Sequence, residues 1–204
     1  MDQAPARQTE RGNTSDKYAT QNPVERRMME GFLGALDEAL PDTSPERILE
    51  VGSGEGEIAA RVLERYPNAG LTVLDLPSEE LAEEWRDRRL AGLFGDITGL
   101  PFEDRTFDLV LAIEVLEHVP EPANALAEIA RVARDATVLS VPREPIWRMG
   151  NMARGRYWRS LGNTPGHVNH WSSGGFARFV GTGLDVLAVH RPLPWTLVSA
   201  RART

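Results

Sequence analysis

The chain has 204 residues, of which 41% are hydrophobic and 26% are charged, as expected for a globular protein with a sizeable core. It contains no cysteine, which excludes disulfides, thiolate metal sites and a cysteine nucleophile. The sequence shows neither an apolar run of membrane-spanning length nor the pattern of a signal peptide. We therefore expect a cytoplasmic protein that does not bind membranes.

The net charge of −7 is unevenly distributed along the chain. Residues 1–139 carry 28 acidic and 14 basic side chains, whereas residues 140–204 carry 2 acidic and 9 basic ones. The basic portion has two interpretations: an ordinary solvated surface, or a contact for a negatively charged substrate or partner. The acidic total argues against a protein that binds nucleic acid.

The hydrophobic pattern predicts one domain that follows a short tail. Residues 1–16 are polar and poor in large apolar groups, so we expect them to be disordered and the domain to occupy 17–204. Apolar runs and helical periodicities alternate through the domain, which predicts an α/β doubly wound parallel sheet. Strands are expected at 47–51, 71–74, 92–94, 107–113, 137–141, 186–189 and 196–200, and helices at 23–40, 56–66, 78–89, 121–133 and 173–181.

Three glycines follow the first expected strand, in the segment Glu50-Val51-Gly52-Ser53-Gly54-Glu55-Gly56. Glycine permits positive φ and close approach of a ligand, and open α/β sheets bind ligands at the carboxyl ends of their strands. The carboxylates of Glu50, Glu55 and Glu57 would repel a pyrophosphate, because phosphate-binding loops depend on positive potential. The loop therefore predicts a ligand that is cationic or rich in hydroxyl groups.

Aspartates stand at the ends of the next two expected strands. Asp75 comes 19 residues after Gly56, where an acid can accept hydrogen bonds from two ribose hydroxyls; the alternative is a cap for the following helix. Asp96 could accept from the exocyclic amine of adenine, with the Ile97 N–H on a ring nitrogen; the alternative is an ordinary turn aspartate. Together with the glycine loop, these residues predict a cationic adenosine cofactor without phosphates.

Longer motifs resemble a known family. Residues 50–56 resemble motif I of the class I S-adenosylmethionine-dependent methyltransferases. Residues 95–104 (Gly-Asp-Ile-Thr-Gly-Leu-Pro-Phe-Glu-Asp), followed by Phe-Asp-Leu-Val at 107–110, resemble the family's next signature. Residues 114–119 (Glu-Val-Leu-Glu-His-Val) resemble the corresponding segment of the type 11, ubiquinone- and menaquinone-type subgroup. These matches cover 47–140 in the family's order and imply a Rossmann-like, seven-stranded sheet whose last strand is antiparallel.

The resemblance also implies which residues contact S-adenosyl-L-methionine. This cofactor carries a sulfonium and an ammonium group but no phosphate, in agreement with the acidic loop. The segment around Tyr18 is expected to fold over the cofactor as a lid, as such N-terminal segments do in this family. The implied cofactor-binding residues are Tyr18, Glu50, Gly52, Ser53, Gly54, Asp75, Leu76, Asp96, Ile97, Glu114 and Val115.

Methyl transfer is an in-line displacement that requires alignment and, where the nucleophile carries a proton, a base. His118 is the first candidate base because imidazole titrates near neutral pH; the alternative is a structural histidine that bonds to the backbone. His167 and His170 are further candidates for catalysis or for the acceptor pocket. Histidines at this spacing could share a metal, but the sequence offers no evident third ligand, so we predict no metal.

Residues 142–172 interrupt the strand–helix rhythm and contain five arginines and three tryptophans. Insertions at this place often build the acceptor pocket in the family. Arginine and tryptophan suit a flat or apolar acceptor that bears an acidic group; the alternative is a hydrophobic plug on the core with arginines facing water. The expected acceptor-binding residues are Arg143, Trp147, Tyr157, Trp158, His167, His170 and Trp171.

We therefore expect a monomeric or homodimeric enzyme that methylates an oxygen or nitrogen of a small molecule. The acceptor would be a secondary metabolite, a sugar or a quinone-like ring. Two alternatives keep the cofactor site: a binding module that regulates a partner without turnover, and an enzyme such as a cyclase that uses only the charge of the sulfonium.

Overall fold

A seven-stranded sheet in the order β3-β2-β1-β4-β5-β7-β6 forms the middle layer of the protein. The computed structural model describes residues 22–153, 155, 160–161 and 163–203. The elements in chain order are α1 (Pro23–Ala39), β1 (Arg47–Val51), α2 (Glu57–Arg65), β2 (Gly70–Asp75), α3 (Glu79–Asp87), β3 (Ala91–Phe94), β4 (Phe107–Ile113), the 3-10 helix η1 (Leu116–His118), α4 (Pro122–Val132), β5 (Ala133–Pro142), α5 (Ile146–Ala153), α6 (Ser173–Val180), β6 (Leu184–His190) and β7 (Trp195–Ala202).

The strand directions follow the expected topology. Strands β3, β2, β1, β4 and β5 pair in parallel, whereas β7 pairs antiparallel with both β5 and β6. The prediction of a doubly wound, seven-stranded sheet with an antiparallel last strand is confirmed. The reversal of strand order next to β1 and β4 creates the edge at which such sheets bind ligands.

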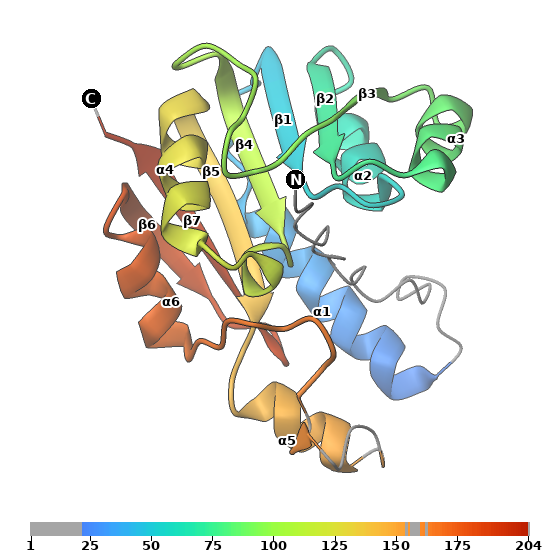
Figure 1. The fold of residues 1–204 in the computed structure, drawn as a ribbon, viewed down its shortest axis with the longest axis vertical. Helices are drawn as coiled ribbons and strands as arrows, with labels where there is room; N and C mark the ends of the chain where they lie inside the picture. Colours follow the sequence, from blue (N-terminus) through green and yellow to red (C-terminus); the bar gives the residue numbers. More distant parts are fainter. Residues whose placement is uncertain (1–21, 154, 156–159, 162, 204) are drawn as a thin grey trace, which may run out of the picture.

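Helices cover both faces of the sheet (Figure 1). Alternate residues of β4 enter different cores: Leu109 and Leu111 pack with α1, α2 and α3, and Val110 and Ala112 pack with α4 and α6. A central strand must be apolar where it is buried on both faces. This requirement explains the uninterrupted apolar run from Leu109 to Ile113, which follows Asp108 near the start of β4.

Polar caps define where the helices begin. The Asn22 side chain accepts a hydrogen bond from the Val24 N–H at 2.9 Å, with Pro23 in the first turn of α1. Ser78 Oγ accepts from the Leu81 N–H at 3.3 Å at the start of α3. These side chains satisfy N–H groups that have no partner within the helix.

Three local features differ from the sequence prediction. Strand β5 begins at Ala133 rather than 137, because it follows α4 directly and pairs with the whole of β4. Helices η1 and α5 were not predicted, since one has only three residues and the other lies among prolines and glycines that obscure its periodicity.

The expected tail at 1–16 and the expected lid residue Tyr18 lie outside the described residues. No helix in the described part of the chain is long and apolar enough to cross a membrane.

Candidate functional site

The glycine loop between β1 and α2 closes against β2 and against the segment that follows β4. The N–H groups of Gly52 and Ser53 donate to the Leu74 carbonyl at 2.7 and 3.3 Å. Gly52 has a φ of +69°, and a Cβ at this position would lie 2.3 Å from Val115 Cγ2. Only glycine meets both demands, the left-handed backbone and the close contact.

Asp75, at the end of β2, is directed to the glycine loop. Its Oδ2 accepts from the Gly54 N–H at 2.8 Å, and its Oδ1 accepts from the N–H of the exposed Leu76 at 2.7 Å. The cap of the following helix is Ser78, so the helix-cap alternative does not describe Asp75. The carboxylate instead orders the loop that would surround a ligand.

Glu50 is a buried carboxyl at the base of the loop, with 2% of its surface exposed. Burial raises its pKa to about 8; the charge of Asp75 acts in the same direction and a backbone hydrogen bond from Ala59 opposes it. Glu50 Oε2 and Ser53 Oγ are buried and have no hydrogen-bond partner among the described residues. Because buried polar groups are nearly always paired, these atoms fit a ligand that brings donors, such as an ammonium group.

Asp96 and Ile97 follow β3 on the same edge of the sheet. Asp96 Oδ1 accepts from the N–H and the hydroxyl of Thr98 at 2.8 and 2.7 Å. Asp96 therefore acts as a turn aspartate through its Oδ1. Its Oδ2 has no hydrogen bond to the described residues and could bind a ligand. Asp96 is exposed and Ile97 is buried, so the pair presents a carboxylate beside an apolar side chain.

Trp85 is a contributor that the sequence did not indicate. Its Nε1 donates to the Gly54 carbonyl at 2.7 Å, and its ring stacks on Phe94 with centroids 5.0 Å apart. A large aromatic residue in the otherwise charged helix α3 was the available signal. Trp85 and Asp75 thus hold the carbonyl and the N–H of the same loop residue, Gly54.

Glu114 and Val115 leave the end of β4 beside the glycine loop. Glu114 has a φ of +57°, and its N–H is shared between the carbonyl and hydroxyl of Ser140, both at 3.1 Å. Its carboxylate accepts a hydrogen bond from the Trp195 indole N–H. A non-glycine residue held in the left-handed region costs energy and is concentrated at functional sites.

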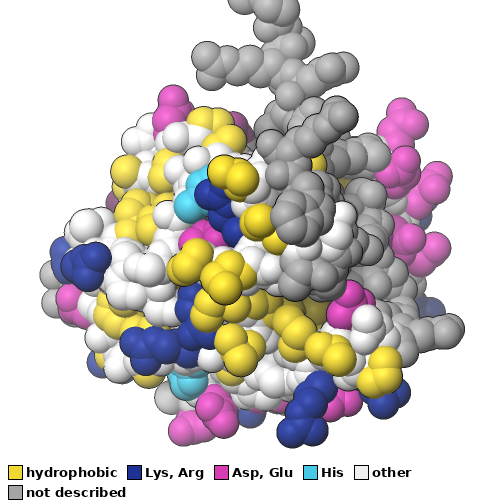
Figure 2. Space-filling view, turned by 90° about the horizontal axis from the view of Figure 1, so that it is seen from below, with side chains coloured by type: hydrophobic (Ala, Val, Ile, Leu, Met, Phe, Trp, Pro, Cys, Tyr) yellow, Lys and Arg dark blue, Asp and Glu magenta, His cyan; other side chains and the backbone are white. Residues whose placement is uncertain are grey.

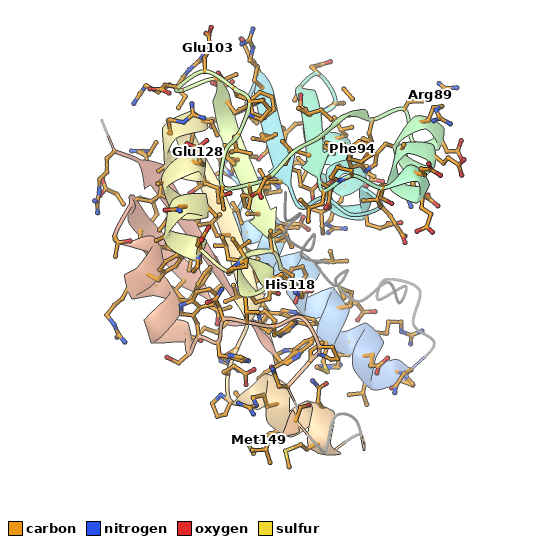
Figure 3. The ribbon with its side chains drawn as sticks, viewed as in Figure 1. Arg89, Phe94, Glu103, His118, Glu128 and Met149 are labelled. Carbon is orange, nitrogen blue, oxygen red and sulfur yellow. The ribbon has the colours of Figure 1, made fainter. Side chains whose placement is uncertain are left out.

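Three polar side chains meet just beyond this point. His118 Nδ1 and the Gly166 carbonyl are 3.0 Å apart, and the rings of His118 and His167 pack edge to face with centroids 4.8 Å apart. One ligand atom each from Glu117, His118 and His167 lies within 4.8 Å of the other two. The structural-histidine alternative is thus realised at Nδ1 of His118, while Glu117 is a site residue that sequence reasoning missed. Figure 3 places His118 at the carboxyl end of the sheet, between the sheet and the segment that contains α5.

The tryptophans of the acceptor segment divide between the two interpretations. Trp147 stacks near His167, with centroids 6.1 Å apart, and its Nε1 donates to Thr164 Oγ1 at 2.9 Å. Trp171 packs against two phenylalanines of α6 at 5.5 and 5.3 Å. Trp147 therefore adjoins the histidines, whereas the contacts of Trp171 are those of a hydrophobic plug.

The remaining acceptor candidates are placed as follows. Arg143 Nε is buried and has no hydrogen-bond partner in the described part of the chain. His170 is exposed and its Nε2 lies 2.6 Å from Asn163 Oδ1; the structure does not bring it into the group formed by His118 and His167. Tyr157 and Trp158 lie outside the described residues.

The face that carries α5 is rich in hydrophobic side chains interspersed with basic ones (Figure 2). Met149, Leu161 and Val168 are each more than half exposed. All three belong to the segment 142–172, and exposed apolar side chains that gather on one face are typical of binding surfaces.

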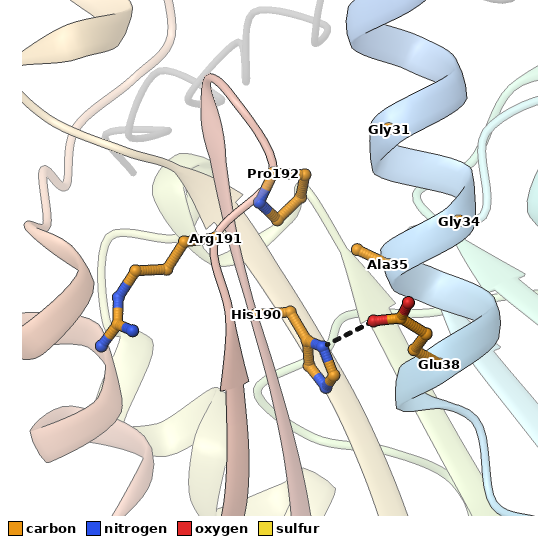
Figure 4. A pocket seen from close by; sticks show the side chains of 7 residues that line it. All are labelled: Gly31, Gly34, Ala35, Glu38, His190, Arg191 and Pro192. Atoms are coloured by element: carbon orange, nitrogen blue, oxygen red, sulfur yellow. Dashed lines mark ion pairs between the residues drawn. The ribbon is translucent and has the colours of Figure 1, made fainter.

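Two surface hollows lie away from the glycine loop. One of about 420 Å³ lies between α1 and the turn from β6 to β7, where His190 Nδ1 is 3.5 Å from Glu38 Oε2 (Figure 4). The other, of about 380 Å³, lies at the amino ends of strands β1 to β4. The buried, unsatisfied polar atoms at the carboxyl edge are stronger evidence for a site than the size of these hollows.

Comparison with known proteins agrees with the geometry. Residues 49–141 match the family model described as a methyltransferase domain. The chain is 36% identical over 126 residues to a malonyl-[acyl-carrier protein] O-methyltransferase of Geobacter sulfurreducens, covering 59% of this chain and 45% of the relative. It is also 36% identical over 141 residues to a ubiquinone/menaquinone biosynthesis C-methyltransferase of Dinoroseobacter shibae, covering 63% and 55%. The chain thus spans about half the length of these curated relatives.

A solved structure extends the similarity over most of the chain. The methyltransferase in a complex with the Haloferax volcanii Trm112 methyltransferase activator superposes with a TM-score of 0.69 and 20% identity. The match covers 89% of this chain and 92% of that one. At this identity the likeness concerns the fold alone, and its coverage extends well beyond residues 49–141.

Proposed function

Residues 49–141 belong to the class I S-adenosylmethionine-dependent methyltransferases of the type 11 group, and from this we propose that the protein methylates an oxygen or nitrogen of a small-molecule acceptor. S-adenosylmethionine supplies a methyl group that is already activated by its sulfonium. The protein must then hold the cofactor, align the acceptor and accept the acceptor's proton.

The observation that carries the proposal is the acidic, partly unsatisfied glycine loop. Glu50 and Ser53 provide buried acceptor atoms without partners among the residues described, and they would receive the ammonium end of the cofactor. Asp75 would accept from the ribose hydroxyls while it continues to order Gly54. Asp96 and Ile97 would contact the adenine, and Glu114 and Val115 would line the place of the methyl group.

His118 is the candidate base for the acceptor. A carbonyl oxygen only accepts hydrogen bonds, so Nδ1 of His118 must donate to Gly166, and in the neutral ring Nε2 then carries the lone pair. A base held in one tautomer does not have to reorganise during the reaction. The proton of a hydroxyl or ammonium acceptor would pass to Nε2.

The acceptor is proposed to combine an apolar body with an acidic group. Arg143 has a buried Nε without a partner in the described chain, and guanidinium groups pair well with carboxylate or phosphate. The curated relatives are named for malonyl-[acyl-carrier protein] and for quinone biosynthesis. An acid-bearing or quinone-like acceptor would suit both Arg143 and the apolar face beside it.

Turnover of acceptor panels with purified protein tests the proposal. Carboxylic acids, phenols, quinols and amines are offered with S-adenosylmethionine, and the release of S-adenosylhomocysteine and the product mass are measured. The proposal expects a product that is heavier by one methyl group. His118→Asn retains a donor for Gly166 but removes Nε2, and it should lower turnover by about 100-fold or more without weakening cofactor binding; a twofold change would count against a catalytic His118.

Two other outcomes correspond to the remaining alternatives. Cofactor binding without turnover of any acceptor class would indicate a regulatory binding module. A product of unchanged mass would indicate an enzyme such as a cyclase, which needs the cofactor but does not transfer its methyl group.

A further inference from the structure

The group formed by Glu117, His118 and His167 has the composition of a metal site. Its three ligand atoms, one from each side chain, lie within 4.8 Å of one another. Imidazole nitrogens with a carboxylate oxygen are ligands of divalent transition metals such as Zn²⁺ and Mn²⁺. Donors at about 2.0–2.2 Å from one Zn²⁺ lie roughly 3–4 Å apart. The three side chains would therefore have to move closer together by about an ångström to bind one ion.

The surroundings hold these ligands in place. The carbonyl of Glu117 accepts from the N–H groups of Val168 and Asn169 at 2.8 and 3.1 Å. The Asn169 side chain donates to the carbonyls of Leu116 and Val119 at 3.0 and 2.6 Å. These bonds join η1 to a segment some fifty residues later in the chain. The backbones that carry the ligands are therefore fixed before any ion binds.

The histidines are also oriented individually. His118 donates through Nδ1 to Gly166, so in the neutral ring the lone pair that can bind a metal is on Nε2; metal-binding histidines almost always donate their other N–H in this manner. The His167 ring packs edge to face with the ring of His118 and stacks with the indole of Trp147. Glu117 and His167 are only 2% and 8% exposed and are shielded from bulk water, whereas His118 is half-buried and forms the accessible part of the site.

We propose that Glu117, His118 and His167 bind one divalent metal ion of the Zn²⁺ or Mn²⁺ class. Three protein ligands leave coordination positions open, as in catalytic metal sites. Val115, which precedes η1, contacts Gly52 of the glycine loop, so the ion would lie on the acceptor side of the cofactor. Its further role rests on the proposed function: it would bind the acceptor through oxygen and favour loss of the hydroxyl proton.

This role and that of His118 as a general base are mutually exclusive at one time, because both use the Nε2 lone pair. With metal bound, the acceptor hydroxyl would bind as the alkoxide or phenolate, and its proton would leave to solvent. The oxygen would then attack the methyl carbon as the carbon–sulfur bond breaks. Loss of turnover in His118→Asn fits both roles, so metal binding must be measured directly.

The test uses the full chain, stripped with a chelator and free of cofactor. Zn²⁺ binding is measured by calorimetry and Co²⁺ binding by visible absorption. We expect one ion per chain, and at least about tenfold weaker binding in each of Glu117→Gln, His118→Asn and His167→Asn. The matched control is His190→Asn, since His190 pairs with Glu38 at 3.5 Å as a histidine–carboxylate pair outside this group; its metal binding should equal that of the wild type.

The outcomes separate this proposal from the proposed function. Absence of binding by the wild type at millimolar Zn²⁺ and Co²⁺, or equal affinity in all three ligand variants, would overturn the metal site. Melting curves identify a variant that does not fold, and the remaining ligand variants then decide. Metal binding without any binding of S-adenosylhomocysteine would leave the metal site standing while the proposed function failed.

Discussion

The cofactor side and the acceptor side of this site are built in different ways. The cofactor side consists of loops that follow β1, β2 and β3 within residues 50–97, and its prominent polar groups are carboxylates. The proposed acceptor side combines Arg143 and η1 with residues 163–171, and hydrogen bonds between distant segments hold η1 against residues 168–169. The carboxylates of one side suit a cation, and on the other side arginine and histidine are proposed to receive an oxygen-bearing acceptor. Variants that change only one side test whether cofactor binding and acceptor binding are independent of each other.

The largest effect is expected from Gly52→Ala on the cofactor side. Its Cβ would lie 2.3 Å from Val115 Cγ2 on a backbone with a φ of +69°. Left-handed strain costs about 1–2 kcal/mol and the clash about 1–3 kcal/mol, so affinity for S-adenosylhomocysteine should fall about 100-fold or more in calorimetry.

Gly54→Ala is the matched control, since it also has positive φ but no atom within 4 Å of the added Cβ. This variant carries only the backbone strain, so its affinity for S-adenosylhomocysteine should fall about tenfold. Equal losses in the two variants would show that the contact with Val115 is unimportant.

A second effect is expected from the pH dependence of Glu50. Its pKa in the folded protein is about 8, above the ordinary value of 4.5, so the native state binds this proton more tightly than the unfolded chain. The contribution of Glu50 to the free energy of unfolding of the cofactor-free protein should therefore be complete below pH 4.5. It should decrease as the pH rises from 4.5 to about 8. The decline is on the order of 5 kcal/mol at most.

Denaturant unfolding between pH 5 and 9 measures this dependence. Glu50→Gln should remove it, whereas Glu55→Gln, at an exposed position in the same loop, should retain it. The ionised form of Glu50 is the one that attracts an ammonium group, so affinity for S-adenosylhomocysteine should rise with pH toward 8. A pH dependence that is unchanged in Glu50→Gln would contradict this account of the buried carboxyl.

The smallest effect is expected on the acceptor side, from Arg143→Gln. Loss of a charge-assisted hydrogen bond of about 1.5–3 kcal/mol should raise KM for an acidic acceptor about tenfold or more and leave affinity for S-adenosylhomocysteine unchanged. Arg178→Gln, at an exposed position on α6, serves as the control. Weaker cofactor binding in Arg143→Gln would show that the two sides are not separate.

The contrast between the sides also explains what could be predicted from the sequence. Parallel strands end at one edge, so the spacing of Gly52, Asp75 and Asp96 sufficed to place them together. The group around His118 could not be assembled in this way. Its partner His167 depends on the path of residues 142–172, and that segment lacks the periodicity by which helix α5 would have been recognised. From the sequence, His170 is the evident partner for His167 at a shared metal, and no sequence pattern distinguishes Glu117 as a partner of His118.

Competitive binding to the wild-type protein tests the central claim most directly. S-adenosylhomocysteine and a nicotinamide dinucleotide share adenosine but differ in charge, because only the dinucleotide carries a pyrophosphate. An acidic loop that contains the buried Glu50 should bind S-adenosylhomocysteine at one site per chain in calorimetry and should not measurably bind the dinucleotide. Binding of the dinucleotide without binding of S-adenosylhomocysteine would contradict the account of the loop and of the cofactor it holds.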